Sequence, residues 1–192
     1  YDNRLPLAIR WGKGIKNPGR VINDYVSFSD FAPTFLEIAG IDLANHNMED
    51  FSGSSWKSIF NDDPIQKKRN YMIIGKERHD VGRQNDKGYP VRAIIADRYF
   101  YSLNFKPNRW PAGNPETGYL NTDGSPTKTE ILNLKREGLN EDYWNLSFGR
   151  RPEETLYDLK KDPDCVENIA QNNKYGFIKD SLRKVLIEDL KI

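Results

Sequence analysis

The spacing of apolar residues predicts helices and strands that alternate irregularly along the chain. An apolar run at residues 7–9 predicts a short buried strand near the start. A helix is expected over residues 31–39, because its apolar positions form one broad face. Asp30 is suited to cap that helix, and Gly40 stands where a helix commonly ends. A second, short helix is expected over residues 55–60.

Strand patterns dominate the next part of the chain. Residues 71–75 predict one strand, and residues 91–96 with 99–105 predict a hairpin. Residues 106–128 are rich in proline, glycine and asparagine, and they predict a long loop of the kind that is functional or packed on another lobe. Residues 131–134 are expected to begin a short helix.

The last part of the chain predicts one more strand and two helices. Residues 155–159 have a strand pattern. Asp162, followed by proline, predicts the start of a helix over residues 164–170, because its carboxylate can accept unpaired N–H groups. A final helix is expected over residues 174–190, with a buried stripe formed by Ile178, Leu182, Val185, Leu186 and Leu190.

The length and charge of the chain limit its possible domain organisation and partners. The 192 residues suffice for one domain or two small lobes. A boundary is expected between residues 60 and 70, where the sequence is polar and turn-forming. The 29 basic residues nearly balance the 28 acidic ones, so no nucleic-acid partner is expected. No apolar run approaches the roughly 20 residues of a membrane span. Because the sequence starts at Tyr1 without methionine, we expect a fragment of a longer protein.

The residues show no complete catalytic apparatus. His46 and His79 are far apart, and the single Cys165 completes neither a zinc site nor a disulfide. Cys165 falls in the first turn of an expected helix, a place that can lower a thiol pKa, but no histidine is near it in sequence. No serine stands in a G-x-S-x-G elbow.

One polar segment stands out between two predicted strands. The stretch IGKERHDVGRQNDKGYPVR, residues 74–92, combines charged, amide and glycine residues with His79, one of two histidines in the chain. Two readings are open at this point. The segment is either a solvated loop whose charges pair with one another, or a binding surface.

Three stretches resemble the C-terminal portion of formylglycine-dependent sulfatases, in the alkaline phosphatase-like superfamily. They are LPLAIRWGKGIKNPGRVINDYVSFSDFAPTFLEIAGI at residues 5–41, FSGSSWKSIF at 51–60 and ETLYDLKKDPDCVENIA at 154–170. The last differs from the family pattern at Cys165, where glutamate is usual. The YPVRAI stretch looks closest to the N-sulfoglucosamine sulfohydrolase, or sulfamidase, branch.

The resemblance implies an α/β fold with two parts. Residues 1–65 would be the last piece of the catalytic α/β domain. Residues 66–192 would be a small α+β subdomain with an antiparallel sheet packed on a C-terminal helix. The C-x-P-S-R or S-x-P-x-R motif that carries the formylglycine nucleophile is absent here. The 192 residues alone are therefore expected to be inactive. Calcium is implied for the full-length enzyme, with no cofactor expected in this fragment.

The resemblance also implies a substrate and a location. Family members hydrolyse sulfate esters or N-sulfate groups of sulfated sugars of the glycosaminoglycan type, and the C-terminal subdomain closes one wall of the pocket. Expected partners are a sulfated carbohydrate and the N-terminal catalytic part. Self-association through exposed apolar surface is also expected. A periplasmic, extracellular or lysosome-like location is implied for the full-length protein.

Glu77, Arg78 and His79 directly follow a predicted strand and are the candidate substrate-binding residues. Arg78 is suited to pair with a sulfate or carboxylate, His79 to bond a hydroxyl or protonate a leaving group, and Glu77 to accept from sugar hydroxyls. Trp110 and Tyr119 either stack on sugar rings or anchor the long loop. The alternative functions are a free-standing carbohydrate-binding module and a structural lobe.

Overall fold

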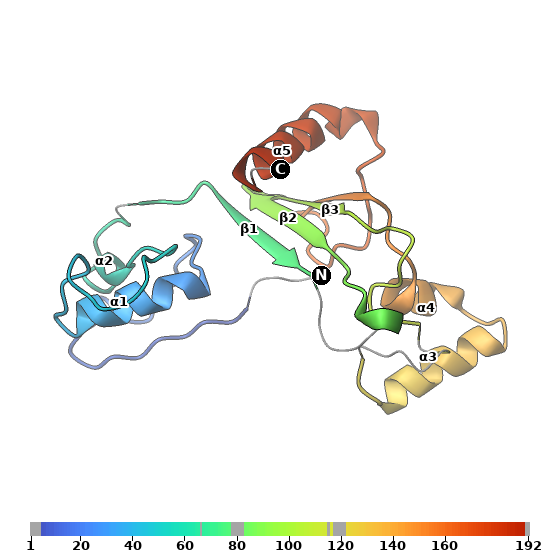
Figure 1. Cartoon of the computed structure of the whole chain (residues 1–192), viewed down its shortest axis with the longest axis horizontal. Coiled ribbons are helices and arrows are strands. Elements are labelled where there is room, and N and C mark those ends of the chain that lie inside the picture. Colours follow the sequence, from blue (N-terminus) through green and yellow to red (C-terminus); the bar gives the residue numbers. More distant parts are fainter. Residues whose placement is uncertain (1–4, 66, 78–82, 115, 117–121, 191–192) are drawn as a thin grey trace. The chain divides into compact units, whose positions relative to one another are not determined.

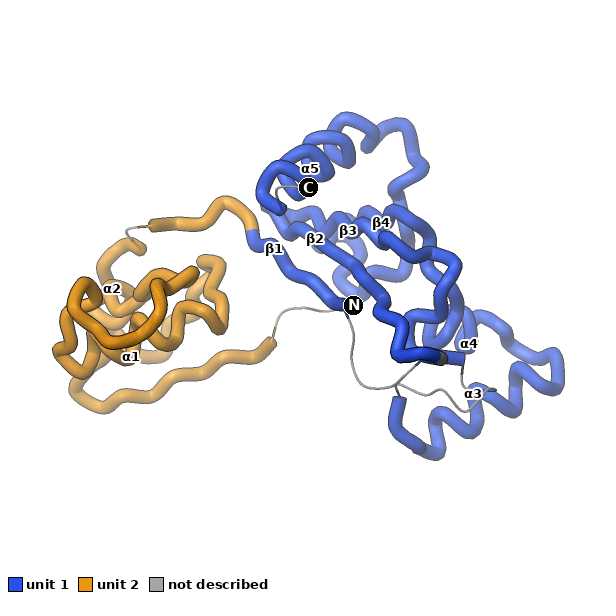
Figure 2. The backbone as a smooth tube through the Cα atoms, viewed as in Figure 1, with its two compact units in different colours: residues 1–2, 72–192 blue, residues 3–71 orange. Residues whose placement is uncertain are grey.

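The computed structural model describes residues 5–65, 67–77, 83–114, 116 and 122–190. The chain divides into two compact units, residues 3–71 and residues 1–2 with 72–192 (Figure 2). We call them the smaller unit and the larger unit. No helix of the described residues is both long and apolar enough to cross a membrane.

The smaller unit contains the 3-10 helix η1 (Phe28–Asp30), then α1 (Phe31–Ile38) and α2 (Lys57–Phe60). Ser27 begins η1 as its N-cap, and its side chain and that of Asp30 form a capping box. Gly40 follows the end of α1 with φ of 78°, a left-handed value that suits glycine. Both helices expected in this part are therefore confirmed.

Asp30 does not cap α1 with its side chain, contrary to the prediction. Its fully buried carboxylate instead accepts hydrogen bonds from the backbone N–H groups of Ser27 and Ser54, both at 2.8 Å. It also accepts from both terminal nitrogens of Arg69, at 2.7 and 2.6 Å. The reason is that η1 precedes α1, so Ser27 takes the capping position and the carboxylate is available to join three segments.

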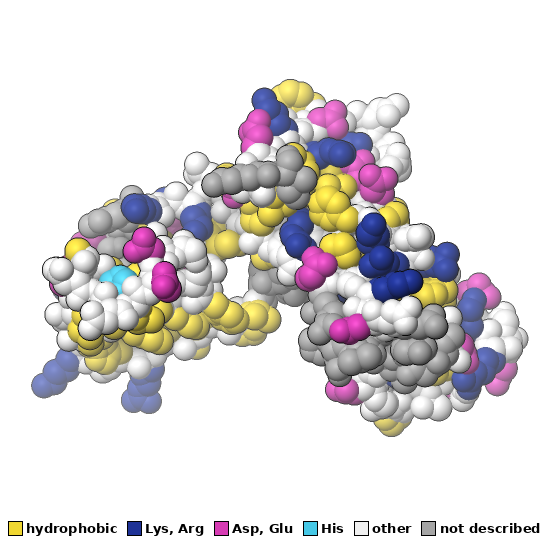
Figure 3. Space-filling model, in the orientation of Figure 1, with side chains coloured by type: hydrophobic (Ala, Val, Ile, Leu, Met, Phe, Trp, Pro, Cys, Tyr) yellow, Lys and Arg dark blue, Asp and Glu magenta, His cyan; other side chains and the backbone are white. Residues whose placement is uncertain are grey.

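Trp56 and Phe60 form the centre of the smaller unit, with only 4% and 5% of their surfaces exposed. The strand expected at residues 7–9 is absent, and Leu7 and Ile9 are exposed. An extended segment becomes a stable strand by pairing with a neighbouring strand, and no strand lies wholly within the described residues of the smaller unit. Figure 3 shows apolar side chains gathered on the surface of this unit; its exposed large apolar residues include Leu5, Leu7, Ile9, Trp11, Val21, Ile22, Phe28 and Phe35.

The larger unit is built on a four-stranded sheet in the order β1-β2-β3-β4, whose strands are labelled in Figure 2. Its strands are β1 (Tyr71–Lys76), β2 (Val91–Ala96), β3 (Tyr99–Asn104) and β4 (Glu154–Asp158). The pairs β2–β3 and β3–β4 are antiparallel, and the arrows of β1 and β2 point in opposite directions in Figure 1. The predicted hairpin is thus confirmed; it turns at Asp97, whose φ is 51°.

The C-terminal helix α5 (Gly176–Leu190) follows the 3-10 helix η3 (Asn173–Tyr175) and contacts β2 and β3. Its predicted buried stripe is confirmed in part: Leu186 is fully buried, whereas Ile178, Leu182, Val185 and Leu190 are partly buried. Glu154 of β4 accepts a hydrogen bond from Tyr101 at 2.6 Å and pairs with Lys179 of α5 at 3.3 Å. The helix is therefore held to the sheet by apolar packing and by one charged network.

Two further helices follow the long loop, α3 (Pro126–Arg136) and α4 (Glu141–Phe148). Ser125 caps α3 through its side chain, with Pro126 in the first turn. The prediction located only the short apolar part of α3 and missed α4. The reason is that α4 is short, and its apolar residues Trp144, Leu146 and Phe148 alternate with polar ones, a spacing typical of a strand. In the structure α4 buries Trp144 and Phe148.

The helix predicted over residues 164–170 is not formed. Asp162 does accept the expected backbone N–H groups, at 3.0 and 2.8 Å, but Cys165 has a φ of 56° that breaks a helix. The segment instead runs beside β4, because the N–H of Ile169 donates to Leu156 at 2.9 Å. Cys165 is buried beside the sheet core rather than at a helix start, so the predicted electrostatic effect on its thiol has no basis.

Candidate functional site

The polar segment between β1 and β2 contains the candidate residues, and part of it is described. Glu77 lies in the described residues directly after β1. Arg78 and His79 lie outside the described residues, so their predicted roles stay predictions. Residues 83–90 form the return of the segment into β2 and include the 3-10 helix η2 (Gln84–Asp86).

Glu77 is held between β2 and the return of the segment. Its carboxylate accepts a hydrogen bond from Arg92 at 2.9 Å, and its carbonyl accepts from the N–H of Tyr89 at 2.5 Å. A Cβ added at Gly88 would lie 2.9 Å from its carboxylate, so glycine permits the close approach. The side chain of Glu77 nonetheless remains 60% exposed. Glu77 therefore pairs with Arg92 and is still accessible to a ligand.

Arg83 is the most buried of the segment's cations that the structure describes, with 7% of its surface exposed. Its Nε donates to the carbonyl of Trp110 at 2.7 Å, and a terminal nitrogen donates to that of Pro111. The guanidinium carbon lies 5.1 Å from the ring centre of Tyr89. Burial lowers the pKa of Arg83 from its ordinary value. Arg83 therefore ties the segment to the long loop.

Sequence reasoning missed Arg83, and no signal in the sequence would have found it. An arginine between glycine and glutamine in a polar stretch has the pattern of a solvated residue. Its burial depends on carbonyl groups that are 27 and 28 positions away along the chain.

Lys76, Arg83, Arg92 and Arg109 form what we call the basic cluster. Arg92 donates to the carbonyl of Lys76 at 3.2 Å, and Arg109 donates to that of Gly88 at 2.7 Å. Burial, followed by the charge of Arg83, lowers the pKa of Lys76. The carboxylate of Glu77 pairs with Arg92, so three of the four cations of the cluster remain in excess. An excess of positive charge suits an anionic group such as sulfate.

Trp110 anchors the long loop. Its ring meets that of Trp144 edge to face, with ring centres 5.5 Å apart and an interplanar angle of 83°. The guanidinium carbon of Arg150 lies 4.6 Å from the ring centre of Trp110. These contacts favour the anchoring reading of Trp110. Tyr119 lies outside the described residues.

Calcium, which the resemblance implies for a full-length enzyme, finds no ligand set among the described residues. Within them, no three histidine, cysteine, aspartate or glutamate side chains come together in a group that could hold a metal ion. The groups present near the candidate site are mainly cationic and repel a metal ion.

Comparison with known proteins matches the family model described as N-sulphoglucosamine sulphohydrolase, C-terminal, over residues 1–99. Two relatives named Ulvan-active sulfatase, both from Formosa agariphila, are similar over most of this chain. One is 28% identical over 188 residues, which are 98% of this chain and 33% of the relative. The other is 32% identical over 197 residues, which are 97% of this chain and 29% of the relative. The chain thus spans about a third of the length of these relatives.

A solved structure is also similar in fold. It is that of a candidate sulfatase from Bacteroides thetaiotaomicron, with 20% sequence identity and a TM-score of 0.50. The match covers 84% of this chain and 24% of that chain.

Proposed function

This chain belongs to the N-sulphoglucosamine sulphohydrolase, C-terminal, family of sulfatases, and we propose that it is the C-terminal part of an enzyme that removes sulfate from sulfated sugars. The observation that carries the proposal is the similarity to two sulfatases over nearly the whole of this chain. The proposed substrates are sulfate esters or N-sulfate groups of sugars of the glycosaminoglycan type.

We assign residues 1–65 to the end of the catalytic α/β domain and residues 66–192 to the C-terminal subdomain. The division into two compact units, the second with an antiparallel sheet and a C-terminal helix, supports this assignment. The proposed location of the full-length enzyme is periplasmic, extracellular or lysosome-like.

The bond that is cleaved has two candidates. The family description names a sulfohydrolase of N-sulfoglucosamine, which acts on an S–N bond, whereas the two relatives are named sulfatases active on ulvan. Assays of the full-length enzyme on N-sulfoglucosamine and on O-sulfated sugars, run side by side, decide between the two bonds. Turnover of neither substrate would contradict the proposed function.

Glu77, Arg78 and His79 are proposed to form part of the wall of the substrate pocket. The support is the exposed carboxylate of Glu77 beside the basic cluster, whose positive potential suits a sulfated sugar. Arg78 would pair with a sulfate or carboxylate, and His79 would bond a hydroxyl or protonate the leaving group.

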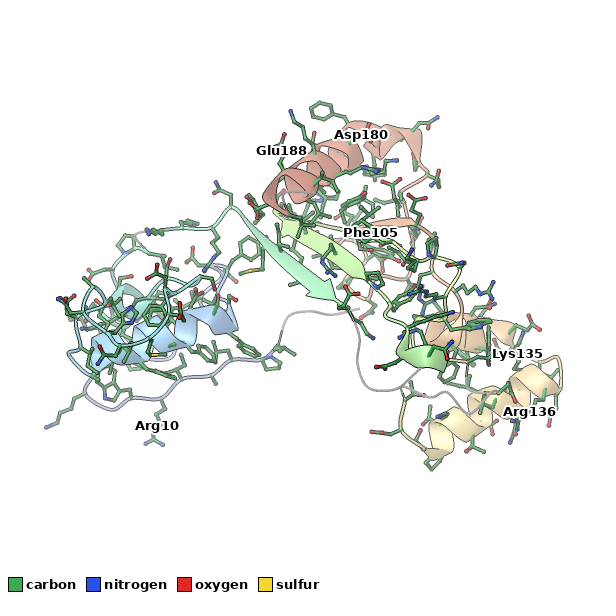
Figure 4. The ribbon with its side chains drawn as sticks, in the orientation of Figure 1. Arg10, Phe105, Lys135, Arg136, Asp180 and Glu188 are labelled. Carbon is green, nitrogen blue, oxygen red and sulfur yellow. The ribbon has the colours of Figure 1, made fainter. Side chains whose placement is uncertain are left out.

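Alanine substitution of each residue in the full-length enzyme tests this role. Loss of a charged hydrogen bond to substrate is expected to lower kcat/KM by about tenfold or more for Arg78→Ala. If His79 is a general acid, His79→Ala is expected to lower kcat by about 10² or more. Arg136→Ala, which removes an exposed cation of α3, is the matched control (Figure 4). If kcat/KM is unchanged in the alanine variants of Glu77, Arg78 and His79, these three residues are not part of the site.

The chain by itself is proposed to be inactive, because its sequence contains neither form of the nucleophile motif. The test is an assay of the purified 192 residues, with calcium, on an aryl sulfate and on N-sulfoglucosamine. Turnover above that of a heat-treated sample would overturn this part of the proposal.

The exposed apolar residues of the smaller unit favour one alternative, a structural lobe that completes the core of the catalytic domain. Co-expression with the N-terminal part is then expected to raise the solubility of the chain. Self-association of the chain alone, measured by sedimentation, is the other expected consequence of this surface. A soluble monomer at high concentration would contradict both expectations.

A further inference from the structure

A pocket of about 550 Å³ opens between the long loop and α4 in the larger unit. It is lined by Trp110 of the loop, by Trp144 and Leu146 of α4, and by Arg150 and Arg151 just beyond that helix. The pocket is wide open to solvent, and its lining combines aromatic and aliphatic side chains with charged groups, as ligand sites commonly do.

The neighbouring Arg150 and Arg151 differ in their contacts. Arg151 donates to the carbonyl of Asn145 at 2.8 Å and to that of Leu146, so it satisfies the end of α4. Arg150 is exposed and rests on the ring of Trp110. Among the described residues Arg150 has no carboxylate partner within salt-bridge distance. Its N–H groups are therefore available to an anion that enters the pocket.

We propose that this pocket binds an acidic sugar residue. The guanidinium of Arg150 would pair with the carboxylate or sulfate of the sugar, a geometry in which arginine forms two parallel hydrogen bonds. The apolar C–H face of the sugar ring would lie against Leu146, and Trp110, whose ring Arg150 covers, would hold the guanidinium in place. An anion beside an aromatic ring alone is unfavourable, so the cation above Trp110 determines the charge of the ligand.

The pocket is connected to the candidate site by Arg83. That residue belongs to the basic cluster and also bonds the carbonyl of Trp110. We therefore infer that the pocket holds a second sugar unit of the polysaccharide, distinct from the sugar that loses its sulfate. This assignment rests on the proposed function, since it names a second contact for the same substrate.

The test compares a long and a short substrate in the full-length enzyme. A heparan sulfate tetrasaccharide would contact the pocket, whereas N-sulfoglucosamine is a single sugar. Arg150→Ala is expected to raise the ratio of the tetrasaccharide KM to the monosaccharide KM by about tenfold. Arg150→Lys should raise the KM ratio less than Arg150→Ala does. Lysine keeps the positive charge but lacks the planar guanidinium that forms two parallel hydrogen bonds. Arg136→Ala, the matched control, should leave the ratio unchanged.

Binding of the tetrasaccharide, measured by calorimetry, is a second readout that needs no turnover. Arg150→Ala should raise Kd by a similar factor, and Leu146→Ala, at a half-exposed position, should raise it less. Tetrasaccharides that have been desulfated or carboxyl-reduced show which anion Arg150 recognises.

Each outcome bears on one proposal. Wild-type enzyme that binds the tetrasaccharide without hydrolysing either substrate contradicts the proposed function, and the Kd values still decide the role of the pocket. An Arg150→Ala enzyme with the Kd and KM ratio of the wild type overturns the pocket assignment. Equal changes in Arg150→Ala and Arg136→Ala also overturn it, because they indicate general charge attraction.

Discussion

Replacement of Asp30 by asparagine is expected to destabilise the smaller unit strongly. Each carboxylate oxygen receives two donors: Oδ1 from Ser54 N–H and Arg69, and Oδ2 from Ser27 N–H and Arg69. An asparagine amide has one oxygen and one NH₂ group. In either orientation its NH₂ therefore faces two donors, so two hydrogen bonds are lost and the charge of Arg69 is left without its partner.

The size of the effect follows from burial. Removal of one partner of a buried ion pair costs about 3–5 kcal/mol. The side chain of Arg69 is 26% exposed, so water compensates part of its loss, and we expect a cost of about 3 kcal/mol. Arg69→Met should cost a similar amount, because it leaves the buried carboxylate with two backbone donors. The double variant should cost less than the sum of the two by about 2 kcal/mol.

Hydrogen exchange followed by mass spectrometry measures this effect in each unit separately. Peptides from α1 report the free energy of opening of the smaller unit, and peptides from β3 in the larger unit are the internal control. Protection of the α1 peptides should fall in the Asp30→Asn protein while that of the β3 peptides is unchanged. A loss below about 1 kcal/mol, or costs of Asp30→Asn and Arg69→Met that simply add, would refute the reasoning.

The remaining predictions concern acid, the sheet and the last helix. Burial raises the pKa of Asp30, but hydrogen bonds and the charge of a guanidinium outweigh it and the net pKa is lowered below 3.8. Its stabilisation is therefore present at neutral pH and lost as pH falls through the lowered pKa, so melting temperature should drop below about pH 4 and drop less in Asp30→Asn. Tyr101→Phe should cost about 1–2 kcal/mol in urea unfolding, because the fully buried Tyr101 donates to Glu154; a cost near zero would show that the bond adds nothing. Leu186→Ala should cost about 2–5 kcal/mol and lower helicity by circular dichroism, whereas Lys184→Ala on the exposed side of α5 should cost almost nothing; equal costs would contradict the packing of this helix.

Two predictions that depended on local periodicity were confirmed, whereas the strand predicted from the apolar run at residues 7–9 is absent. The hairpin at residues 91–105 and the stripe of α5 both follow from short repeats of apolar positions, and the structure has them within a residue or two. The predicted helix at 164–170 was wrong although its start signal, Asp162, works as expected. The segment instead bonds to β4, which gives its backbone groups partners that a local pattern does not show.

The sequence by itself determined the family, the strands of the larger unit and the position of Glu77 after β1, because motifs and periodicity are local properties of the chain. Only the tertiary structure decided the environment of the charged residues. Asp30 was expected to cap a helix and instead pairs with Arg69, and Arg83 had the pattern of a solvated residue and is buried. Their partners lie 39 and 27 positions away, and such distances along the chain carry no periodic signal. The sequence shows which residues are polar, but the fold decides which hydrogen-bond and charge partners they have.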